Sequence, residues 1–158
     1  MQKTNVMRLL EAASIPYRAA EYEYDEKDLS GLHAAEATGM PPEQVFKTLV
    51  ARGDRCGYLV FCIPVCCELD LKKAAKAAGD KKVEMITVKE LLPLTGYLRG
   101  GCSPIGMKKK FPTYIDETAQ LYDEIAVSAG ARGCQIILNP DQLTDYCDAS
   151  YEDLISML

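Results

Sequence analysis

Apolar residues recur at helical spacing in several segments of the chain, and most of these segments begin at a capping residue. Residues 5–13 place Val6, Leu9 and Leu10 on one face, with Thr4 or Asn5 as the N-cap. Further helices are predicted from Ser30 to Gly39, from Asp70 through Ala78 to Gly79, from the capping box Thr87-Val88-Lys89-Glu90 to near Leu94, and after Asn139-Pro140-Asp141-Gln142. A short helical turn is expected at Pro41-Pro42, and a last short helix over residues 151–158.

Alternating or continuous apolar runs predict strands between these helices. They cover residues 17–24, 46–51, 58–63, 83–86, 112–116, 125–129 and 134–138. The turn at residues 52–55 joins two of them into a hairpin, and Gly130-Ala131-Arg132-Gly133 joins the last two. The pattern predicts an α+β fold (mixed α/β) with a curved, barrel-like, mainly antiparallel or mixed sheet flanked by helices.

The composition indicates one folded domain over residues 1–158. Hydrophobic residues make up 48% of the chain, and no linker, repeat or low-complexity segment interrupts it. No apolar run is long enough to cross a bilayer, and the first residues lead into an amphipathic stretch rather than a signal-peptide core. We therefore expect a cytoplasmic protein with no membrane role.

The cysteines and the histidine exclude several kinds of site. Seven cysteines are an odd number in a chain with no export signal, so reduced thiols are expected. No Cys-x-x-Cys pair is present, and His33 is the one histidine, in a setting typical of an ordinary helix. These features predict neither a metal site nor a cofactor, and they make a Ser-His-Asp or Cys-His triad improbable.

A lysine stands in the middle of the apolar run Gln44-Val45-Phe46-Lys47-Thr48-Leu49-Val50. In a strand, Lys47 shares a face with Val45 and Leu49, which are expected to be buried. A charge on that face needs a counter-charge or a ligand. Two interpretations stay open: the lysine lines a cavity, or it faces solvent at an exposed part of the strand.

Two glycine-rich loops could approach a ligand. Residues 96–106 contain Gly100-Gly101-Cys102-Ser103-Pro104-Ile105-Gly106, in which adjacent glycines offer backbone amides as donors. Residues 128–135 form the second loop, around Arg132. Neither loop has the Walker or dinucleotide-binding pattern, and each on its own is also typical of a plain connector or hairpin turn.

Together, Phe46-Lys47-Thr48-Leu49 and the two glycine loops resemble the bacterial YbaK/EbsC family of aminoacyl-tRNA deacylases, and the resemblance covers nearly the whole chain. It implies the mixed α/β editing domain also found inserted in bacterial prolyl-tRNA synthetases. The implied activity is hydrolysis of cysteine mischarged onto tRNA(Pro), a second sieve that is needed because small differences in side-chain volume discriminate weakly. The resemblance also implies that the substrate thiol attacks its own ester, with no protein nucleophile.

The resemblance assigns roles by match of motif. Lys47 would contact the tRNA 3′ end or the reacting ester, and the amides of Gly100 and Gly101 would hold the carbonyl oxygen. The residues implied to line the aminoacyl pocket are Tyr22, Phe46, Thr48, Cys102, Ser103, Pro104, Gly106, Ser128, Gly130 and Gln135. Two positions depart from the family. Gln135 replaces an Asp of some members and can only form hydrogen bonds, and Cys102 replaces an aliphatic residue.

The net charge conflicts with binding a polyanion. With 18 Lys and Arg against 23 Asp and Glu, the chain carries −5. Contact with tRNA phosphates would therefore need a local cluster of lysines or help from prolyl-tRNA synthetase, with which the family is associated. The candidate lysines are Lys72, Lys73, Lys76, Lys81, Lys82, Lys108, Lys109 and Lys110, which as separate runs could equally be solvated faces. Deacylation of another substrate such as Ala-tRNA(Pro), or a non-catalytic tRNA- or synthetase-binding module, remains the alternative.

Overall fold

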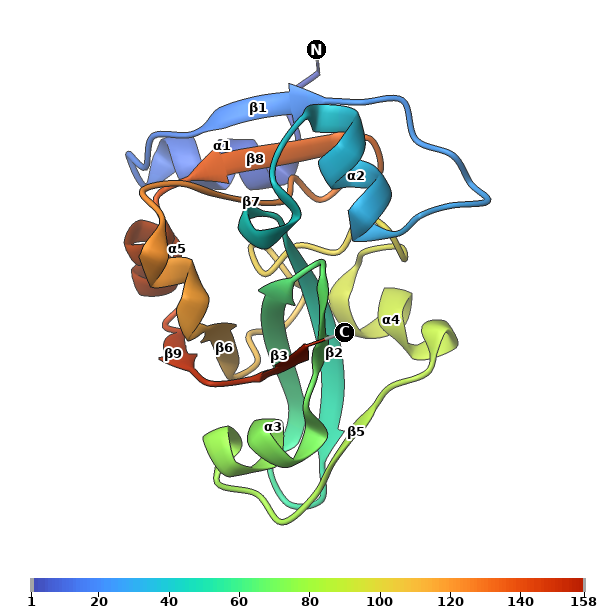
Figure 1. The fold of residues 1–158 in the computed structure, drawn as a ribbon, viewed down its shortest axis with the longest axis vertical. Helices are drawn as coiled ribbons and strands as arrows, with labels where there is room; N and C mark the ends of the chain where they lie inside the picture. The colour runs from blue at the N-terminus through green and yellow to red at the C-terminus, as the bar shows by residue number, and fades with distance from the viewer. Residues whose placement is uncertain (1, 158) are drawn as a thin grey trace.

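The computed structural model describes residues 2–157 and is built on three separate β-sheets with helices around them (Figure 1). The largest sheet has the strand order β5-β2-β3-β6-β9. Its centre is the long antiparallel hairpin of β2 (Phe46–Gly53) and β3 (Gly57–Pro64). β5 (Val83–Met85) pairs with β2, while β6 (Thr113–Asp116) and β9 (Ser150–Glu152) add in parallel.

The second sheet is antiparallel and lies at the N-terminal end of the molecule (Figure 1). It consists of β1 (Arg18–Glu21), β8 (Cys134–Leu138) and β7 (Ile125–Ser128). A parallel bridge between Val45 and Ala126 connects it to the start of β2. The cluster around this junction contains Ala35, Val65 and Ile137. The main core cluster includes Met7, Phe46, Ile115, Ile136 and Leu143. The junction therefore brings the middle of β2 close to β7 and β8.

The predicted helix caps are confirmed. Helices α1 (Asn5–Ala12), α2 (Gly31–Thr38), α3 (Leu71–Ala78), α4 (Val88–Thr95) and α5 (Pro140–Tyr146) begin at Thr4, Ser30, Asp70, Thr87 and Asn139. The 3-10 helix η1 (Pro42–Gln44) forms at the two prolines, and η2 (Glu117–Leu121) follows β6. Short-range hydrogen bonds from capping side chains set these boundaries, which is why the sequence revealed them.

The mixed α/β fold is confirmed, but its barrel-like form is not, and the predicted C-terminal helix is wrong. No sheet within residues 2–157 closes into a barrel, because β7 and β8 pair with β1 in a sheet of their own. The C-terminal segment is not a helix: it forms β9 and then β10 (Ile155–Met157), which pairs antiparallel with β4 (Cys67–Leu69). Leu154 lies fully buried between these strands. Pairing with distant strands therefore overrides the weak helical pattern of this short segment. Residue 158 of that prediction lies outside the described residues.

Candidate functional site

A cavity of about 470 Å³ opens where β2 meets the second sheet. Its walls include residues 46–50 of β2, the beginning of α2, and the side chains of Ser128 on β7 and Gln135 on β8. The rest of the lining comes from Arg99, Gly100 and Cys102, from Val65 and the carboxylate residue Glu68, and from the stretch between Met85 and Leu91. Predicted site residues that line it are Tyr22, Phe46, Lys47, Thr48, Gly100, Cys102, Ser128 and Gln135. Segments that are far apart in the sequence thus form one pocket, as the family resemblance implied.

Lys47 is half-buried in the cavity wall rather than fully exposed. It pairs with Ile63 across the central hairpin, which fixes its place on β2. Ion pairs engage Lys3, Lys73, Lys82 and Lys110, but within residues 2–157 no carboxylate forms one with Lys47. Its ammonium group is therefore available to a ligand inside the cavity.

Helix α2 reaches the cavity because it begins with glycine. A Cβ added at Gly31 would lie 2.2 Å from Cγ1 of Val65 and 3.9 Å from Cβ of Lys47. Any larger residue would push the helix away from the wall that carries the lysine. The Ser30 hydroxyl accepts from the amide of His33 and holds the start of α2 in place.

The loop at residues 98–101 turns sharply beside the cavity. The Gly101 amide donates to the carbonyl of Leu98 at 2.9 Å, and Gly100 has a φ of +87°, as in a type II turn. The N–H of Gly101 is thus used inside the turn, and this residue does not line the cavity. Gly101 instead lies against Ala131 and Arg132, where an added Cβ would be 3.1 Å from the Arg132 nitrogen. Gly100 remains the candidate donor.

Four more predicted pocket residues, Ser103, Pro104, Gly106 and Gly130, lie outside the cavity lining. Ser103 is fully buried, and its hydroxyl accepts from the Ile105 amide at 3.3 Å. The Tyr97 hydroxyl donates to the Ile105 carbonyl. The ring of Tyr97 also fills the space that a side chain at Gly130 would need. Ser103 and Tyr97 thus brace the loop through its own backbone, and sequence reasoning missed Tyr97.

Ser128 and Gln135 face each other across β7 and β8, as direct partners in the strand register. Their side chains therefore project from the same face of the sheet. The Ser128 hydroxyl accepts from the Gly130 amide at 3.1 Å. Gln135 is 6% exposed, and its Oε1 has no hydrogen-bond donor among residues 2–157. A buried, unpaired acceptor of this kind costs about 1–3 kcal/mol.

Cys102 is the cysteine that lines the cavity in the described part of the chain. Burial raises the pKa of its thiol to about 12, so it is protonated at neutral pH and is a poor nucleophile. His33 lies outside the lining and packs edge-on against the Tyr22 ring, with 6.1 Å between ring centroids. No group of three or more His, Cys, Asp or Glu residues within residues 2–157 could hold a metal ion.

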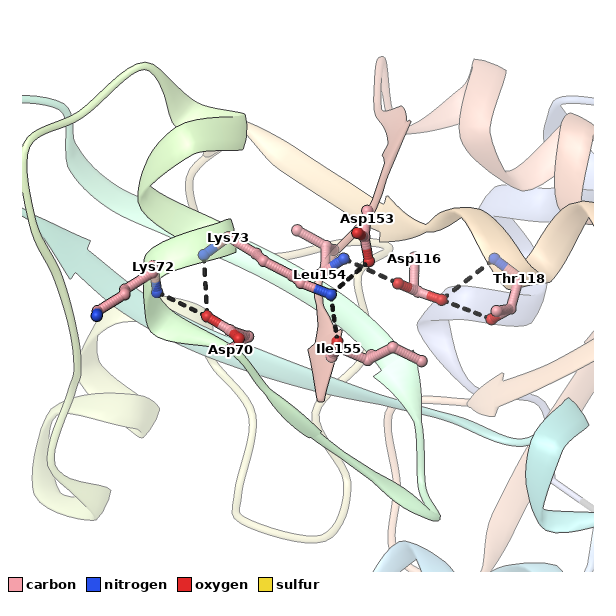
Figure 2. A network of polar contacts seen from close by, with 8 residues as sticks. All are labelled: Asp70, Lys72, Lys73, Asp116, Thr118, Asp153, Leu154 and Ile155. Carbon is pink, nitrogen blue, oxygen red and sulfur yellow. Dashed lines mark hydrogen bonds and ion pairs between the residues drawn. The ribbon is translucent and has the colours of Figure 1, made fainter. Parts of the chain in front are cut away.

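The lysines proposed for tRNA contact differ in their surroundings. Lys73 Nζ donates to Asp153 Oδ1 at 3.1 Å and to the Ile155 carbonyl at 2.8 Å, as Figure 2 shows. Its charge therefore holds the C-terminal strands, while the Lys72 side chain points away from this network (Figure 2). Lys82 pairs with Glu84, and Lys110 pairs with Asp148. The remaining candidates, Lys76, Lys81, Lys108 and Lys109, are exposed.

An apolar rim at the cavity mouth was not foreseen from the sequence. It is formed by Leu32, Met85, Val88 and Leu91, and the first three are exposed. Leu32 belongs to α2 and the others to the stretch from β5 into α4. Single exposed apolar residues are common in any sequence, so these four could be recognised as a group only once the fold placed them around one opening.

Within residues 2–157, the cavity thus combines a lysine, a glycine turn and a protonated thiol on a frame of mixed sheets. The chain belongs to the aminoacyl-tRNA editing domain family, whose model matches residues 30–146. The resemblance stated from the sequence is thereby confirmed.

The family includes a relative that is similar over nearly the whole chain. It is an Enterococcus faecalis (strain ATCC 700802 / V583) protein named "Putative Cys-tRNA(Pro)/Cys-tRNA(Cys) deacylase EbsC", 50% identical over 153 residues, which cover 97% of this chain and 93% of that protein. A solved structure described as "a putative trans-editing enzyme for prolyl tRNA synthetase" is 26% identical, with a TM-score of 0.82 over 99% of both chains. The structure of "hypothetical protein APE2540" shares the fold at 20% identity, with a TM-score of 0.87 over 97% of this chain and 100% of that one.

Proposed function

We propose that this protein is a trans-editing deacylase that removes cysteine from mischarged Cys-tRNA(Pro). The observation that carries the proposal is Lys47, which stands in the cavity wall without a carboxylate partner among the described residues. Membership of the editing family and the 50% identity to a protein named as a Cys-tRNA deacylase supply the substrate class.

The chemistry uses the thiol of the substrate. The cysteinyl sulfur attacks its own ester carbonyl, forms a carbon–sulfur bond and breaks the bond to the ribose oxygen. The thiol proton ends on that oxygen, and water later opens the released thiolactone to cysteine. This route fits a site in which burial raises the pKa of Cys102 and keeps it protonated. It leaves the protein the tasks of positioning the ester and stabilising charge.

Each task has a candidate group. Lys47 stabilises the negative charge that develops on the ester oxygens, and the Gly100 amide assists at the carbonyl oxygen. Phe46 and Thr48 flank Lys47 on β2, and Tyr22 closes the pocket from the segment after β1. An amide or ammonium donor at such a position contributes about 2.7–4 kcal/mol to transition-state stabilisation, which corresponds to about 10²–10³ in rate.

The acceptor stem is held by few protein charges, because the chain carries −5 overall. Lys72, Lys76, Lys108 and Lys109 contribute contacts to tRNA phosphates, and prolyl-tRNA synthetase supplies further tRNA binding in the cytoplasm.

No helix within residues 2–157 is long and apolar enough to span a membrane.

The test is deacylation of purified Cys-tRNA(Pro) by wild type and Lys47→Met. We expect the variant to lose about 10²–10³ in kcat/KM. Lys89→Met is the matched control, since it removes an exposed lysine outside the cavity lining. Unchanged turnover by Lys47→Met at full folding would reject the site assignment.

The substrate separates this proposal from its alternatives. Ser-tRNA(Pro) should react far more slowly, because a hydroxyl is a weaker nucleophile than a thiol. Faster release of alanine from Ala-tRNA(Pro) than of cysteine would reassign the specificity. Absence of turnover on every ester, with tRNA still bound, would identify a binding module instead.

A further inference from the structure

We propose that a second hollow, beside the cavity, binds the base of the nucleotide that precedes the esterified adenosine, and that it prefers a base with an exocyclic amine. The inference rests on the proposed function and extends it from the amino acid to the RNA. In a tRNA this nucleotide is a cytidine, which carries such an amine. The proposal gives a role to the loop around Arg132, which the deacylation chemistry leaves unused.

The second hollow has a volume of about 370 Å³ and lies where β1 leads into the long loop before α2 (Figure 1). The register of β1 against β8 sets Glu21 opposite Cys134, one on each side of the hollow. Pairing of these strands therefore fixes the position of its two walls. The full lining consists of residues 2–4, Glu21, Tyr22, Tyr24 and residues 131–134.

Two observations place this hollow next to the cavity that holds Lys47. Tyr22 lines both spaces. Arg132, which lines the hollow, donates from Nε to the carbonyl oxygen of Arg99, which lines the cavity, at 2.9 Å. A ligand whose end lies in the cavity can therefore continue directly into the hollow. For a cysteinyl ester of RNA, the part that continues is the preceding nucleotide.

The ring of Tyr24 offers a surface for a base in this hollow. It is 43% exposed, which is unusual for a large aromatic side chain in a folded protein. A Cβ added at Gly133 would lie 3.0 Å from Cδ1 of this ring and 2.8 Å from the Tyr22 carbonyl oxygen. The glycine thus lets the ring lie close to the loop that carries Arg132. Single-stranded nucleic acids are bound by stacking of their bases on exposed aromatic rings of this kind.

The hollow also holds one positive and one negative side chain that are free to bind a ligand. The hydrogen bond from Nε to Arg99 holds the guanidinium group of Arg132 in place, and its terminal nitrogens remain as donors. Neither Arg132 nor Glu21 takes part in an ion pair among the described residues. Lys3 is already engaged, since its Nζ donates to Glu11 at 2.6 Å.

These charges favour a base over a phosphate. The negative charge of Glu21 offsets that of Arg132, so the hollow has little net attraction for a phosphate group. A base that carries an amine beside a ring acceptor suits both groups at once. For cytosine, the carboxylate accepts from the N4 amine, and the guanidinium donates to the neighbouring acceptors. Uracil has a carbonyl oxygen in place of the amine, which would set one acceptor against another at Glu21.

The first experiment compares substrates that differ by one nucleotide. The substrates are the cysteinyl esters of the dinucleotide CpA and of adenosine, and the readout is the ratio of their kcat/KM values. This ratio cancels changes in the shared chemistry of the ester. The proteins are wild type, Tyr24→Leu, Tyr24→Phe and Arg132→Met. Arg55→Met is the control, because Arg55 is exposed and lies outside both linings.

We expect wild type to prefer the CpA ester and Tyr24→Leu to lower the ratio by about 5- to 150-fold, the range for loss of one base–aromatic stack. Tyr24→Phe keeps the ring and should keep the ratio, and Arg55→Met should also match wild type. Arg132→Met should lower the ratio as Tyr24→Leu does. A preference for CpA that Tyr24→Leu and Arg132→Met both retain would overturn the inference, because the nucleotide would then bind elsewhere, for example at the apolar rim.

The second experiment tests the preference for an amine. Wild type should hydrolyse the cysteinyl ester of CpA faster than that of UpA, and Glu21→Gln should narrow the difference, because its amide can donate to the uracil oxygen. Equal rates for the two dinucleotide esters in wild type would overturn the preference for an amine.

The adenosine ester separates failure of the inference from failure of the proposed function. If wild type hydrolyses this ester and the CpA ester equally well, the deacylase function stands and the inference falls. If wild type hydrolyses none of the esters and does not hydrolyse Cys-tRNA(Pro), the proposed function is rejected, and the inference with it.

Discussion

The carboxylate of Asp116 is a buried anchor of the C-terminal strands. It is 0% exposed, at the end of β6. One of its oxygens accepts from the Leu154 amide at 3.0 Å, and the other accepts from the Thr118 amide at 3.1 Å and from its hydroxyl at 2.6 Å (Figure 2). We predict that Asp116→Asn destabilises the protein even though the side chain keeps its shape.

The size of the effect follows from these three hydrogen bonds. Asparagine keeps one acceptor oxygen, so its NH₂ group must face either the Leu154 amide or the Thr118 amide. One backbone N–H then loses its acceptor inside the protein, at a cost of about 1–3 kcal/mol. For a chain of this size that is a fall of roughly 2–12 °C in Tm. Asp116→Ala leaves the Leu154 and Thr118 amides both without an acceptor and should cost about 2–6 kcal/mol.

Urea unfolding measures this cost, with Glu117→Gln as the matched control. Glu117 is the neighbouring carboxylate and is exposed, so its amide variant should stay within about 0.5 kcal/mol of wild type. Amide hydrogen exchange at Leu154 gives a local readout and should accelerate in Asp116→Asn. If Asp116→Asn unfolds at the wild-type urea concentration, the anchor contributes no net stability and this reasoning is wrong.

Three further predictions concern the site and its surroundings. Gly31→Ala should cost about 1–3 kcal/mol of stability and weaken deacylation, because its Cβ would lie 2.2 Å from Cγ1 of Val65. In thermal unfolding, the double variant with Val65→Ala should regain part of the lost Tm. The free energy of unfolding should fall as pH rises from about 9 towards 12, because burial raises the pKa of Cys102 to about 12 and the thiol of the unfolded chain ionises first. Urea titrations at several pH values should show a smaller fall for Cys102→Ala than for wild type. Lys73→Met should lower Tm but change the salt dependence of tRNA binding little, whereas Lys72→Met should reduce that slope and leave Tm unchanged.

Most helices and strands could be predicted from short-range features of the sequence. Ser30, Asp70 and Asn139 each hydrogen-bond to amides one turn ahead, so their caps are properties of a few neighbouring residues. The segment after Tyr151 was predicted wrongly because its partners are β4 and β6, far away in the chain. The pattern of apolar residues within an eight-residue segment cannot show that the segment pairs with distant strands.

In the candidate site as well, short motifs predicted some residues correctly, whereas others depended on the tertiary structure. The motif around Lys47 marked a residue that does line the cavity, and Gly100 does so as well. Gly101 looked equivalent to Gly100, but its amide closes the turn onto Leu98. Which of two adjacent amides faces a ligand depends on the turn geometry, and the role of Tyr97 depends on tertiary packing. Neither is encoded in a short motif.

The buried thiol in the cavity gives the reaction a problem of chemical selectivity. When a cysteinyl ester is bound, two sulfur atoms share one pocket, and only that of the substrate can leave with the product. An ionised Cys102 could take the acyl group onto the protein and trap it as a thioester. Because burial raises the pKa of Cys102, the pocket residue keeps its proton. In the proposed reaction the attacking sulfur is therefore that of the substrate. Under the proposed mechanism, burial of Cys102 thus protects the protein from acylating itself during turnover.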